Sequence, residues 1–392
     1  MNPVYIVAAK RTPMGSFGGA LSTFSATQLG SVAIKGAIEA AGVAADQIDE
    51  VFMGNVISAN LGQAPVTQAM IGAGIPPQVP STTINKVCAS GMKATMIGAQ
   101  SIMLGQNNLV VSGGMESMSN IPYYIPGARW GYKFGPGQLL DGLQRDGLQD
   151  AFDQEAMGTR GDATAEKYQI SRERQDAFAI QSYKRAAAAT ESGDFSKEIV
   201  PVEIPQRKGD SILVTEDEEF RKVQFDKIAG LKPVFGPAGT VTAANASTLN
   251  DGASALVLAS EEAVKSHNLK PIARIVSFAD SANEPKWFTT APSKAANIAL
   301  QRAGLNIKDI EYFEVNEAFA VVALSFIDTM GISEEQVNVF GGAVAIGHPL
   351  GSSGSRIITT LINVLHSKNA RYGMAAICNG GGGASAIIIE RI

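Results

Sequence analysis

Both cysteines of the chain lie where a thiol could act on a substrate. Cys88 follows the strand-like run Ser81–Val87 and precedes a stretch of helical character that begins at Ala89. A cysteine at a helix N-terminus meets the positive end of the helix dipole, which lowers the thiol pKa and favours the nucleophilic thiolate. Cys378 ends a second apolar run, just before the glycine turn 380–383. We therefore expect a nucleophilic site; for Cys88 the alternative is a small side chain packed between elements.

Three further features extend this set. His348 lies in a glycine-flanked turn before a helical run, and histidine is the side chain best suited to moving protons near neutral pH. Asn316 ends another strand-like run, where its amide could hold a water molecule against a reacting carbonyl. The glycine turn 380–383 can expose backbone N–H groups to an oxyanion. Taken alone, the histidine and the asparagine could equally cap helices, and the glycines could simply form a tight turn.

The elements that carry these residues belong to two similar halves. A helix that ends at a glycine occurs at residues 37–43 and again at 299–305, and an acidic loop and a strand follow each copy. Alternating strands and helices predict βαβ units around largely parallel sheets, and such sheets bind ligands at the ends of their strands. The segment between the halves breaks the pattern. It contains one clear predicted helix, Arg172–Thr190, with Ser171 as its cap.

Composition narrows the function classes. The chain has 392 residues and a net charge of −5, with 45% hydrophobic and 18% charged residues, which excludes a disordered chain and argues against a nucleic-acid-binding protein. Two cysteines exclude a disulfide-rich scaffold and a four-cysteine zinc site. Because there is no long apolar run and no leader-like segment at the N-terminus, we expect no membrane span and a cytoplasmic protein. The alternative is the mitochondrial matrix, if a transit segment has been removed.

Glycine is enriched, at 41 residues. Many of these glycines lie beside the candidate residues, where we expect them to clear space for a ligand and to expose backbone donors. The ones concerned are Gly113, Gly114, Gly341, Gly342, Gly347, Gly351 and the turn 380–383.

Five ordered blocks resemble the thiolase family, and the resemblance covers essentially the whole length. The blocks are NKVCASG from Asn85, GGMESM from Gly113, NEAF from Asn316, GGAVAIGHP from Gly341 and CNGGG from Cys378. Within the family, the sequence looks most like the potassium-activated acetoacetyl-CoA thiolases, which are acetyl-CoA C-acetyltransferases. The resemblance implies the reversible Claisen condensation of two acetyl-CoA molecules to acetoacetyl-CoA and CoA through an acetyl-cysteine.

The resemblance also implies a fold. It is an α/β, thiolase-like fold in which two duplicated βαβ-type halves with mixed sheets form layers in the order α/β/α/β/α, with an inserted loop domain. We expect the N-terminal half at residues 1–118, together with part of the segment around 240–270. The insert that covers coenzyme A is then 119–249, and the C-terminal half is 250–392.

The family's chemistry assigns a role to each candidate. By resemblance, Cys88 is the nucleophile that becomes acetylated, and His348 takes its proton and later polarises the substrate thioester. Cys378 is the acid and base that removes the α-proton of the second acetyl-CoA. Asn316 holds the water of one oxyanion hole, and the backbone N–H groups of Cys88 and Gly380 form the other. Two cysteines are needed because one sulfur cannot be nucleophile and base at once.

Coenzyme A would occupy a groove of its own and enters as substrate, with no redox cofactor. The residues that the resemblance places along it are Leu148, Met157, Tyr183, Lys222, Val223, Gln224, Lys227, Phe235, Ala243, Ser247, Ala318 and Phe319. Ala156 departs from the pattern, since many relatives have a histidine there against the coenzyme. A potassium ion would be bound by a tyrosine and backbone carbonyls, which suit a hard cation. The matching positions are Tyr183, Ala243, Ala244, Ala246 and Val344; alternatively, these alanines only line the coenzyme channel.

Two other functions stay open. One is a degradative 3-ketoacyl-CoA thiolase of broader chain length, and the other is a non-catalytic acyl-CoA-binding protein. As partners we expect acyl-CoA substrates, neither nucleic acid nor membrane, and a homotetramer built as a dimer of dimers that uses the loop Ser119–Asp141.

Overall fold

A ten-stranded sheet runs through the whole molecule. The computed structural model describes residues 2–392. Nine strands follow one another in the order β12-β13-β14-β11-β1-β10-β5-β3-β4, and the short β2 (Gly15–Ser16) pairs with β10. In chain order the nine are β1 (Val4–Arg11), β3 (Glu50–Gly54), β4 (Ser81–Ile84), β5 (Leu109–Ser117), β10 (Asn250–Ser260), β11 (Ala273–Ala282), β12 (Tyr312–Val315), β13 (Tyr372–Asn379) and β14 (Gly383–Arg391).

The two halves of the chain meet at the middle of this sheet. Strand β1 pairs antiparallel with β11, so that Val4 lies opposite Ile275. On the first-half side, β10 lies between β1 and β5, which places residues 250–260 among first-half strands. We expected part of the segment 240–270 to join the first half; the full division into 1–118, 119–249 and 250–392 stays a prediction.

The prediction of largely parallel sheets was wrong. Only β3–β4, β3–β5 and β12–β13 are parallel, and the other strand pairs of the sheet are antiparallel. One physical reason is the short glycine turn 380–382 between β13 and β14, because so short a link can join only antiparallel strands. The mixed sheet implied by the thiolase resemblance is confirmed.

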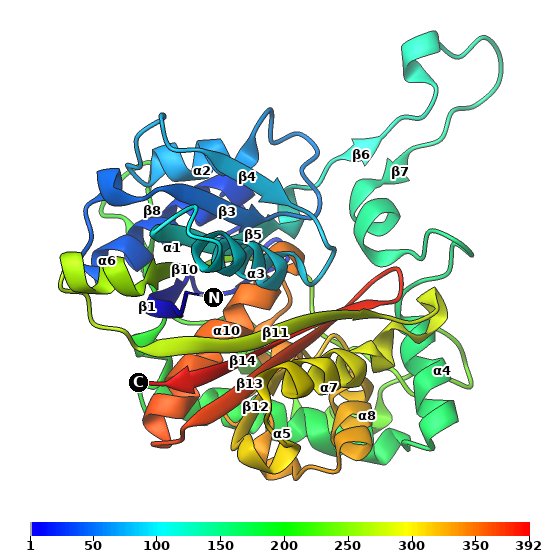
Figure 1. Ribbon diagram of the computed structural model, residues 1–392. Coiled ribbons are helices and arrows are strands. Elements are labelled where there is room, and N and C mark those ends of the chain that lie inside the picture. The colour runs from blue at the N-terminus through cyan, green and yellow to red at the C-terminus, as the bar shows by residue number, and fades with distance from the viewer. Residues whose placement is uncertain (1) are drawn as a thin grey trace.

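Helices form three layers around the two parts of the sheet (Figure 1). The central layer consists of α3 (Ser90–Met103) and α10 (Leu350–Ser367), which pack against each other and between the two parts. One outer layer is α1 (Ala26–Ala41) with α2 (Pro65–Gly72), and the other is α7 (Ala291–Ala303) with α8 (Ala320–Met330). The α/β/α/β/α order is therefore confirmed.

The alternation of apolar side chains along the strands explains why helices cover both faces of the sheet. Along β5, Val110 packs in the cluster around α3 and α10, whereas Val111 packs in the cluster around α1. Strand β14 alternates in the same way, with Ile387 toward α10 and Ile388 toward α7. In α10, residues 350–365 are buried on every side, as expected for a helix enclosed by two sheets.

The predicted repeat is present. Helix α1 ends at Gly42 with φ 69° and ψ 27°, and α7 ends at Gly304 with φ 67° and ψ 25°. Both glycines are left-handed caps, a conformation that costs other residues energy.

The segment between the halves contains α4 (Gly158–Tyr168) and α5 (Arg172–Glu191). The side chain of Ser171 accepts a hydrogen bond from the N–H of Arg174, so the predicted helix and its cap are confirmed. The hairpin of β6 (Tyr123–Tyr124) and β7 (Leu140–Asp141) projects far from the body in Figure 1. The remaining elements are β8 (Val202–Ile204), β9 (Ile212–Val214), α6 (Glu261–Ser266) and α9 (Ala343–Ile346). None of the helices in residues 2–392 has the length and apolar character needed to cross a membrane.

Candidate active site

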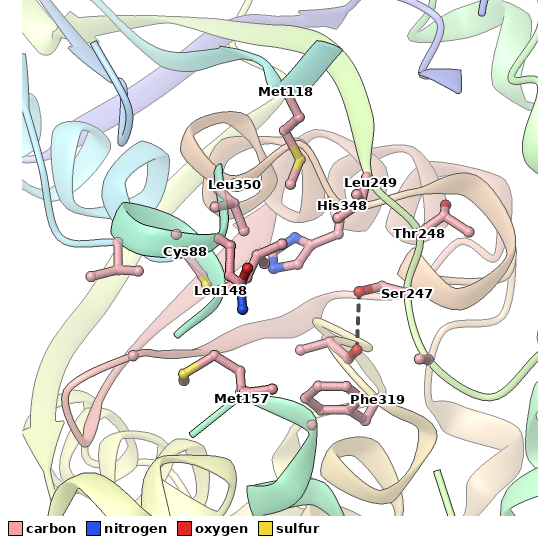
Figure 2. A pocket seen from close by; sticks show the side chains of 18 of the residues that line it. Cys88, Met118, Leu148, Met157, Ser247, Thr248, Leu249, Phe319, His348 and Leu350 are labelled. Carbon is pink, nitrogen blue, oxygen red and sulfur yellow. Dashed lines mark hydrogen bonds between the residues drawn. The ribbon is translucent and has the colours of Figure 1, made fainter. Parts of the chain in front are cut away.

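A cavity of about 220 Å3 brings together side chains from both halves and the insert. Cys88 comes from the loop before α3, His348 from the loop before α10, and Gly380 from the turn after β13. Figure 2 shows the imidazole of His348 pointing toward the side of the cavity where Cys88 lies, with Met157 and Phe319 along another wall. Three residues that are far apart in the sequence and were predicted to act together therefore share one cavity.

The loop 85–89, which carries Cys88, is held in a strained shape. Val87, directly before Cys88, has φ 48°, a region that β-branched residues rarely occupy. The side chain of Asn85 accepts from the N–H of Val87 at 3.0 Å, and the hydroxyl of Ser90 donates to the Val87 carbonyl at 2.6 Å. The same hydroxyl accepts from the N–H of Lys86 at 2.8 Å. Such strain persists only where the surroundings enforce it, and it fixes where the sulfur points.

The Cys88 thiol is protonated at neutral pH. Burial raises its pKa to about 11, although the N–H groups of Gly380 and of Cys88 itself lower it. The charge of Glu116 raises it further. Our expectation of a lowered pKa was wrong. Helix α3 begins only at Ser90, so Cys88 lies outside its first turn, and loss of solvent outweighs the helix dipole. An attack by this sulfur would therefore require a base to accept its proton.

His348 is oriented to be that base. Its Nδ1 lies 2.6 Å from the hydroxyl of Ser353, and that hydroxyl donates to the carbonyl of Pro349 at 2.9 Å. A hydroxyl has one proton, so Nδ1 must be the donor to Ser353, and Nε2 is left with its lone pair. Burial, with a contribution from Arg356, lowers the pKa of His348 to about 3. The ring is therefore neutral at pH 7 and can accept a proton at Nε2.

Asn316 and Cys378 are buried and are not among the residues that line the cavity. The amide nitrogen of Asn316 is 3.4 Å from Nε2 of His348, and within the described residues its buried Oδ1 has no hydrogen-bond partner. Cys378 is fully buried at the end of β13. Burial raises its pKa strongly, and the charge of Cys88 raises it further, so the two sulfurs lie close enough to interact electrostatically.

The proposed coenzyme residues fall into two adjacent hollows. Leu148, Met157, Phe235, Ser247, Ala318 and Phe319 line the cavity of Cys88, and Ala156 and Ala246 line it as well. The hydroxyl of Ser247 donates to the Ala318 carbonyl at 3.0 Å, and the rings of Phe235 and Phe319 meet edge to face. A second hollow of about 310 Å3 is lined by the other six, Tyr183, Lys222, Val223, Gln224, Lys227 and Ala243. Thr248 lines both hollows, which makes them neighbours.

Comparison with known families and proteins decides the family. Residues 4–262 match the family described as thiolase, N-terminal domain, and residues 269–391 match thiolase, C-terminal domain. The chain belongs to the thiolase family. The predicted resemblance is thus confirmed, and the geometry described above is the candidate active site of a thiolase.

Individual relatives of this thiolase cover nearly all of its length. It is 56% identical over 390 residues to an acetyl-CoA acetyltransferase of Schizosaccharomyces pombe, covering 99% of each chain. It is 53% identical to the cytosolic acetyl-CoA acetyltransferase ERG10 of Gibberella zeae, covering 100% of this chain and 98% of the relative. The crystal structure of the Acat5 thiolase from Ascaris suum in complex with coenzyme A has a TM-score of 0.94 and 46% identity, and each chain is covered fully.

The residues proposed for potassium do not all line one hollow. Tyr183, Ala243 and Ala244 line the second hollow, and Ala246 lines the first. Val344 is buried in α9 and lines neither. In the part of the chain that the structure describes, the carbonyls of the three alanines accept no hydrogen bond from the chain. Burial and the charges of Glu219 and Glu317 raise the pKa of the Tyr183 phenol. Free carbonyls beside carboxylates fit a monovalent cation, and the site stays a prediction.

Sequence reasoning gave no role to two residues that shape the site of this thiolase. Ser353 sets the tautomer of His348, and Glu116 binds the N–H groups of Val56, Ile57 and Gly351 at 2.9–3.2 Å. Burial raises the pKa of Glu116 to about 7. Glu116 lies in the block GGMESM, which resembles the thiolase family, so this block could have indicated its importance. The hydroxyl of Ser353 gave no comparable signal, because only the fold brings it against the ring.

Proposed function

We propose that this thiolase is an acetyl-CoA C-acetyltransferase, which joins two acetyl-CoA molecules into acetoacetyl-CoA and CoA by ping-pong catalysis. The observation that carries the proposal is the cavity shared by Cys88, His348 and Gly380, with Cys378 buried close behind. Relatives at 53–56% identity named acetyl-CoA acetyltransferases support it. The same residues make a non-catalytic acyl-CoA-binding protein the weaker alternative.

In the first half-reaction, the Cys88 sulfur attacks the carbonyl of acetyl-CoA while its proton moves to Nε2 of His348. The N–H groups of Cys88 and Gly380, which lower the pKa of the Cys88 thiol, would hold the carbonyl oxygen as it becomes an oxyanion. The bond from the carbonyl carbon to the CoA sulfur then breaks. Cys378 gives its proton to the departing CoA thiolate, which leaves acetyl-Cys88, a Cys378 thiolate and a protonated His348.

In the second half-reaction, the raised pKa of Cys378 makes its thiolate a strong base for the weakly acidic α-proton of a second acetyl-CoA. Protonated His348 and a water molecule on Asn316 stabilise the resulting enolate. The α-carbon attacks the carbonyl of acetyl-Cys88, and the Cys88 sulfur leaves and takes back its proton from His348. The enzyme returns to its starting state, and the product is acetoacetyl-CoA.

Mass spectrometry of the intact protein after mixing with acetyl-CoA tests this function. We expect one acetyl group on Cys88 in the wild type and none in Cys88→Ala. Cys378→Ser should be acetylated slowly, because a serine hydroxyl is a poor proton donor to the departing CoA, and it should condense poorly. A wild-type protein that is never acetylated would leave only acyl-CoA binding, and normal condensation by Cys378→Ser would remove its role as base.

The acyl-chain length of the substrate distinguishes the proposed enzyme from a degradative 3-ketoacyl-CoA thiolase, which would accept a broader range of chain lengths. The cavity of about 220 Å3 holds the reacting groups between bulky side chains such as Leu148, Met157 and Phe319, which favours a short acyl group. Thiolysis of C4 and C16 3-ketoacyl-CoA should therefore differ strongly in rate, in favour of C4. Comparable rates would support the broader enzyme.

Potassium is proposed as a structural cation beside the coenzyme. Tyr183 and the carbonyls of Ala243, Ala244, Ala246 and Val344 are the residues that would hold it. A cation there would neutralise carboxylate charge near the second hollow and order the loop 243–248. Replacing K⁺ by Na⁺ at constant ionic strength should raise the KM for the CoA substrate or lower the rate, and an unchanged profile would contradict the site.

We further propose that this thiolase assembles as a homotetramer, a dimer of dimers, through the projecting hairpin. The apolar side chains exposed on the hairpin support this assembly. The compartment stays a prediction. The cytosolic relative from Gibberella zeae agrees with a cytoplasmic protein, and the mitochondrial matrix remains the alternative.

A further inference from the structure

The ammonium group of Lys86 connects the two halves of this thiolase beside the active site. Lys86 lies on the first-half loop, two residues before Cys88. Its Nζ is 3.1 Å from Oδ1 of Asn379, 3.1 Å from the Ala384 carbonyl and 3.0 Å from the hydroxyl of Ser385. Asp280 completes the shell, at 3.1 Å. All four partners belong to the second half.

Three of these partners flank the glycine turn, since Asn379 precedes it and Ala384 and Ser385 follow it. Asn379 immediately precedes Gly380, and its amide donates to the Gly380 carbonyl at 2.8 Å. Ala384 lies opposite Cys378 in the β13–β14 ladder. One ammonium group therefore contacts residues next to both Gly380, which lines the cavity of Cys88 and whose N–H lowers the Cys88 pKa, and the proposed base Cys378.

The turn itself needs such a restraint. Gly381 and Gly382 have φ values of 80° and 91°, so the backbone here is of a kind that glycine alone adopts easily. Consecutive glycines lose the most conformational freedom on ordering, and the turn has few side chains with which to hold its shape. The Lys86 side chain supplies three polar contacts to residues that flank the turn.

Lys93 provides a natural contrast. Its Nζ lies 2.7 Å from Oδ2 of Asp280, the same carboxylate that Lys86 binds, and its side chain is similarly exposed, at 27% against 23%. Within the described residues, the side chain of Lys93 donates only to Asp280 and does not contact the glycine turn. The two lysines therefore share an ion-pair partner and differ in their contact with the turn.

We propose that Lys86 is a positioning residue, which holds the segment 379–385 of the second half, with its glycine turn, against the loop 85–89 of the first so that the Gly380 N–H faces Cys88. The inference rests on the proposed function of Cys88 and Gly380. Lys86 itself touches no reacting atom; it acts by keeping the oxyanion donor in place.

Lys86→Met tests the proposal, with Lys93→Met as the matched control. Both variants lose one ion pair with Asp280, and Lys86→Met also loses three hydrogen bonds, so a larger decrease in Tm is expected for Lys86→Met. Only Lys86→Met should lower kcat, by about tenfold with KM within about twofold, because losing a whole oxyanion donor costs 100-fold or more and this one is displaced rather than removed. Lys86→Arg should recover part of the rate, since a cation of similar reach can still contact the turn.

A second measurement does not depend on turnover. The Gly380 N–H lowers the pKa of Cys88, so a displaced turn raises that pKa and reduces the thiolate fraction at a fixed pH. Alkylation of Cys88 by iodoacetamide at pH 9 should therefore be about threefold slower in Lys86→Met than in Lys93→Met. A merely structural lysine would lower Tm without changing this rate.

Equal kcat values and equal alkylation rates in the two variants would overturn the proposal. If Lys86→Met does not fold, Lys86→Gln takes its place, because it keeps a polar side chain at this partly exposed position. Its kcat and alkylation rate are then compared with those of Lys93→Met. A wild-type protein that acetyl-CoA does not acetylate would refute the proposed function instead. The alkylation comparison would then still decide whether Lys86 positions the turn.

Discussion

At the scale of single residues, burial sets the protonation state of the reacting groups. The pKa of Cys88 is raised to about 11 and that of His348 is lowered to about 3. Between these values both side chains are neutral, so no thiolate–imidazolium pair exists before the substrate arrives. In the proposed mechanism the proton therefore moves during the attack itself, with His348 as general base in the transition state.

This protonation pattern predicts different pH dependences for two reactions of the same sulfur. Alkylation of Cys88 by iodoacetamide requires the thiolate, so its rate should rise about tenfold per pH unit from pH 7 to 10. Acetyl transfer from acetyl-CoA uses neutral His348 as base, so its single-turnover rate should change by less than about threefold over the same range. Stopped-flow alkylation and rapid-quench mass spectrometry measure the two. An alkylation rate that levels off near pH 7 would show a thiolate already formed in the resting enzyme.

Residue types and motif blocks predicted which groups react, but the ionisation of these groups could not be predicted from the sequence. The helix-dipole argument gave Cys88 the wrong sign because the first turn of α3 begins two residues later and the surrounding atoms exclude water. Both facts depend on tertiary packing. For the same reason the role of Ser353 could not be predicted. Its hydroxyl is five residues from His348 in the sequence, and only the folded helix brings it against Nδ1 of the imidazole.

At the scale of elements, the site depends on how closely α10 approaches β5. A Cβ atom on Gly114 of β5 would lie 1.9 Å from the carbonyl oxygen of Gly351, at the start of α10. The N–H of Gly351 is in turn bound by Glu116 of the same strand, at 2.9 Å. We expected Gly114 to clear space for a ligand. It clears space for the backbone that carries His348, two residues before the helix begins.

Gly114→Ala should therefore destabilise the fold rather than narrow the cavity. The new methyl group meets backbone, which cannot rotate away, and overpacking of this kind costs about 3 kcal/mol or more. Urea unfolding of Gly114→Ala and of Gly236→Ala, whose Cβ would meet nothing within 4 Å, measures the difference. Equal unfolding free energies in the two variants would show that α10 can shift away from β5 at little cost.

The sequence predicted elements better than it predicted their pairing. The two helices that end at Gly42 and Gly304 were visible because a glycine cap and an apolar periodicity are local signals. The antiparallel contact of β1 with β11 was not visible, because it joins strands roughly 270 residues apart and leaves no local trace. The thiolase resemblance supplied the mixed sheet that periodicity alone had assigned as largely parallel.

At the scale of the whole molecule, the candidate site belongs to no single part of the chain. The first half supplies Cys88, the second supplies His348 and Gly380, and the insert supplies Leu148 and Met157. The pairing of β1 with β11 and the central helices α3 and α10 hold these contributions together. The hairpin of β6 and β7 is the exception, because it projects away from this core (Figure 1).

The exposed apolar residues of the β6–β7 hairpin predict how copies of the protein assemble. Trp130 is 85% exposed and Phe134 is fully exposed, and Tyr123, Ile125 and Leu139 add further exposed apolar surface. Apolar patches of this kind mark interaction sites. In the proposed homotetramer, the double substitution Trp130→Ser/Phe134→Ser should convert tetramers to dimers in sedimentation velocity, and kcat should stay within about twofold because the cavity lies elsewhere. Leu213→Ser, which removes an exposed leucine from the β8–β9 hairpin, should leave the tetramer intact. A tetramer that survives the double substitution would show that another surface holds the dimers together.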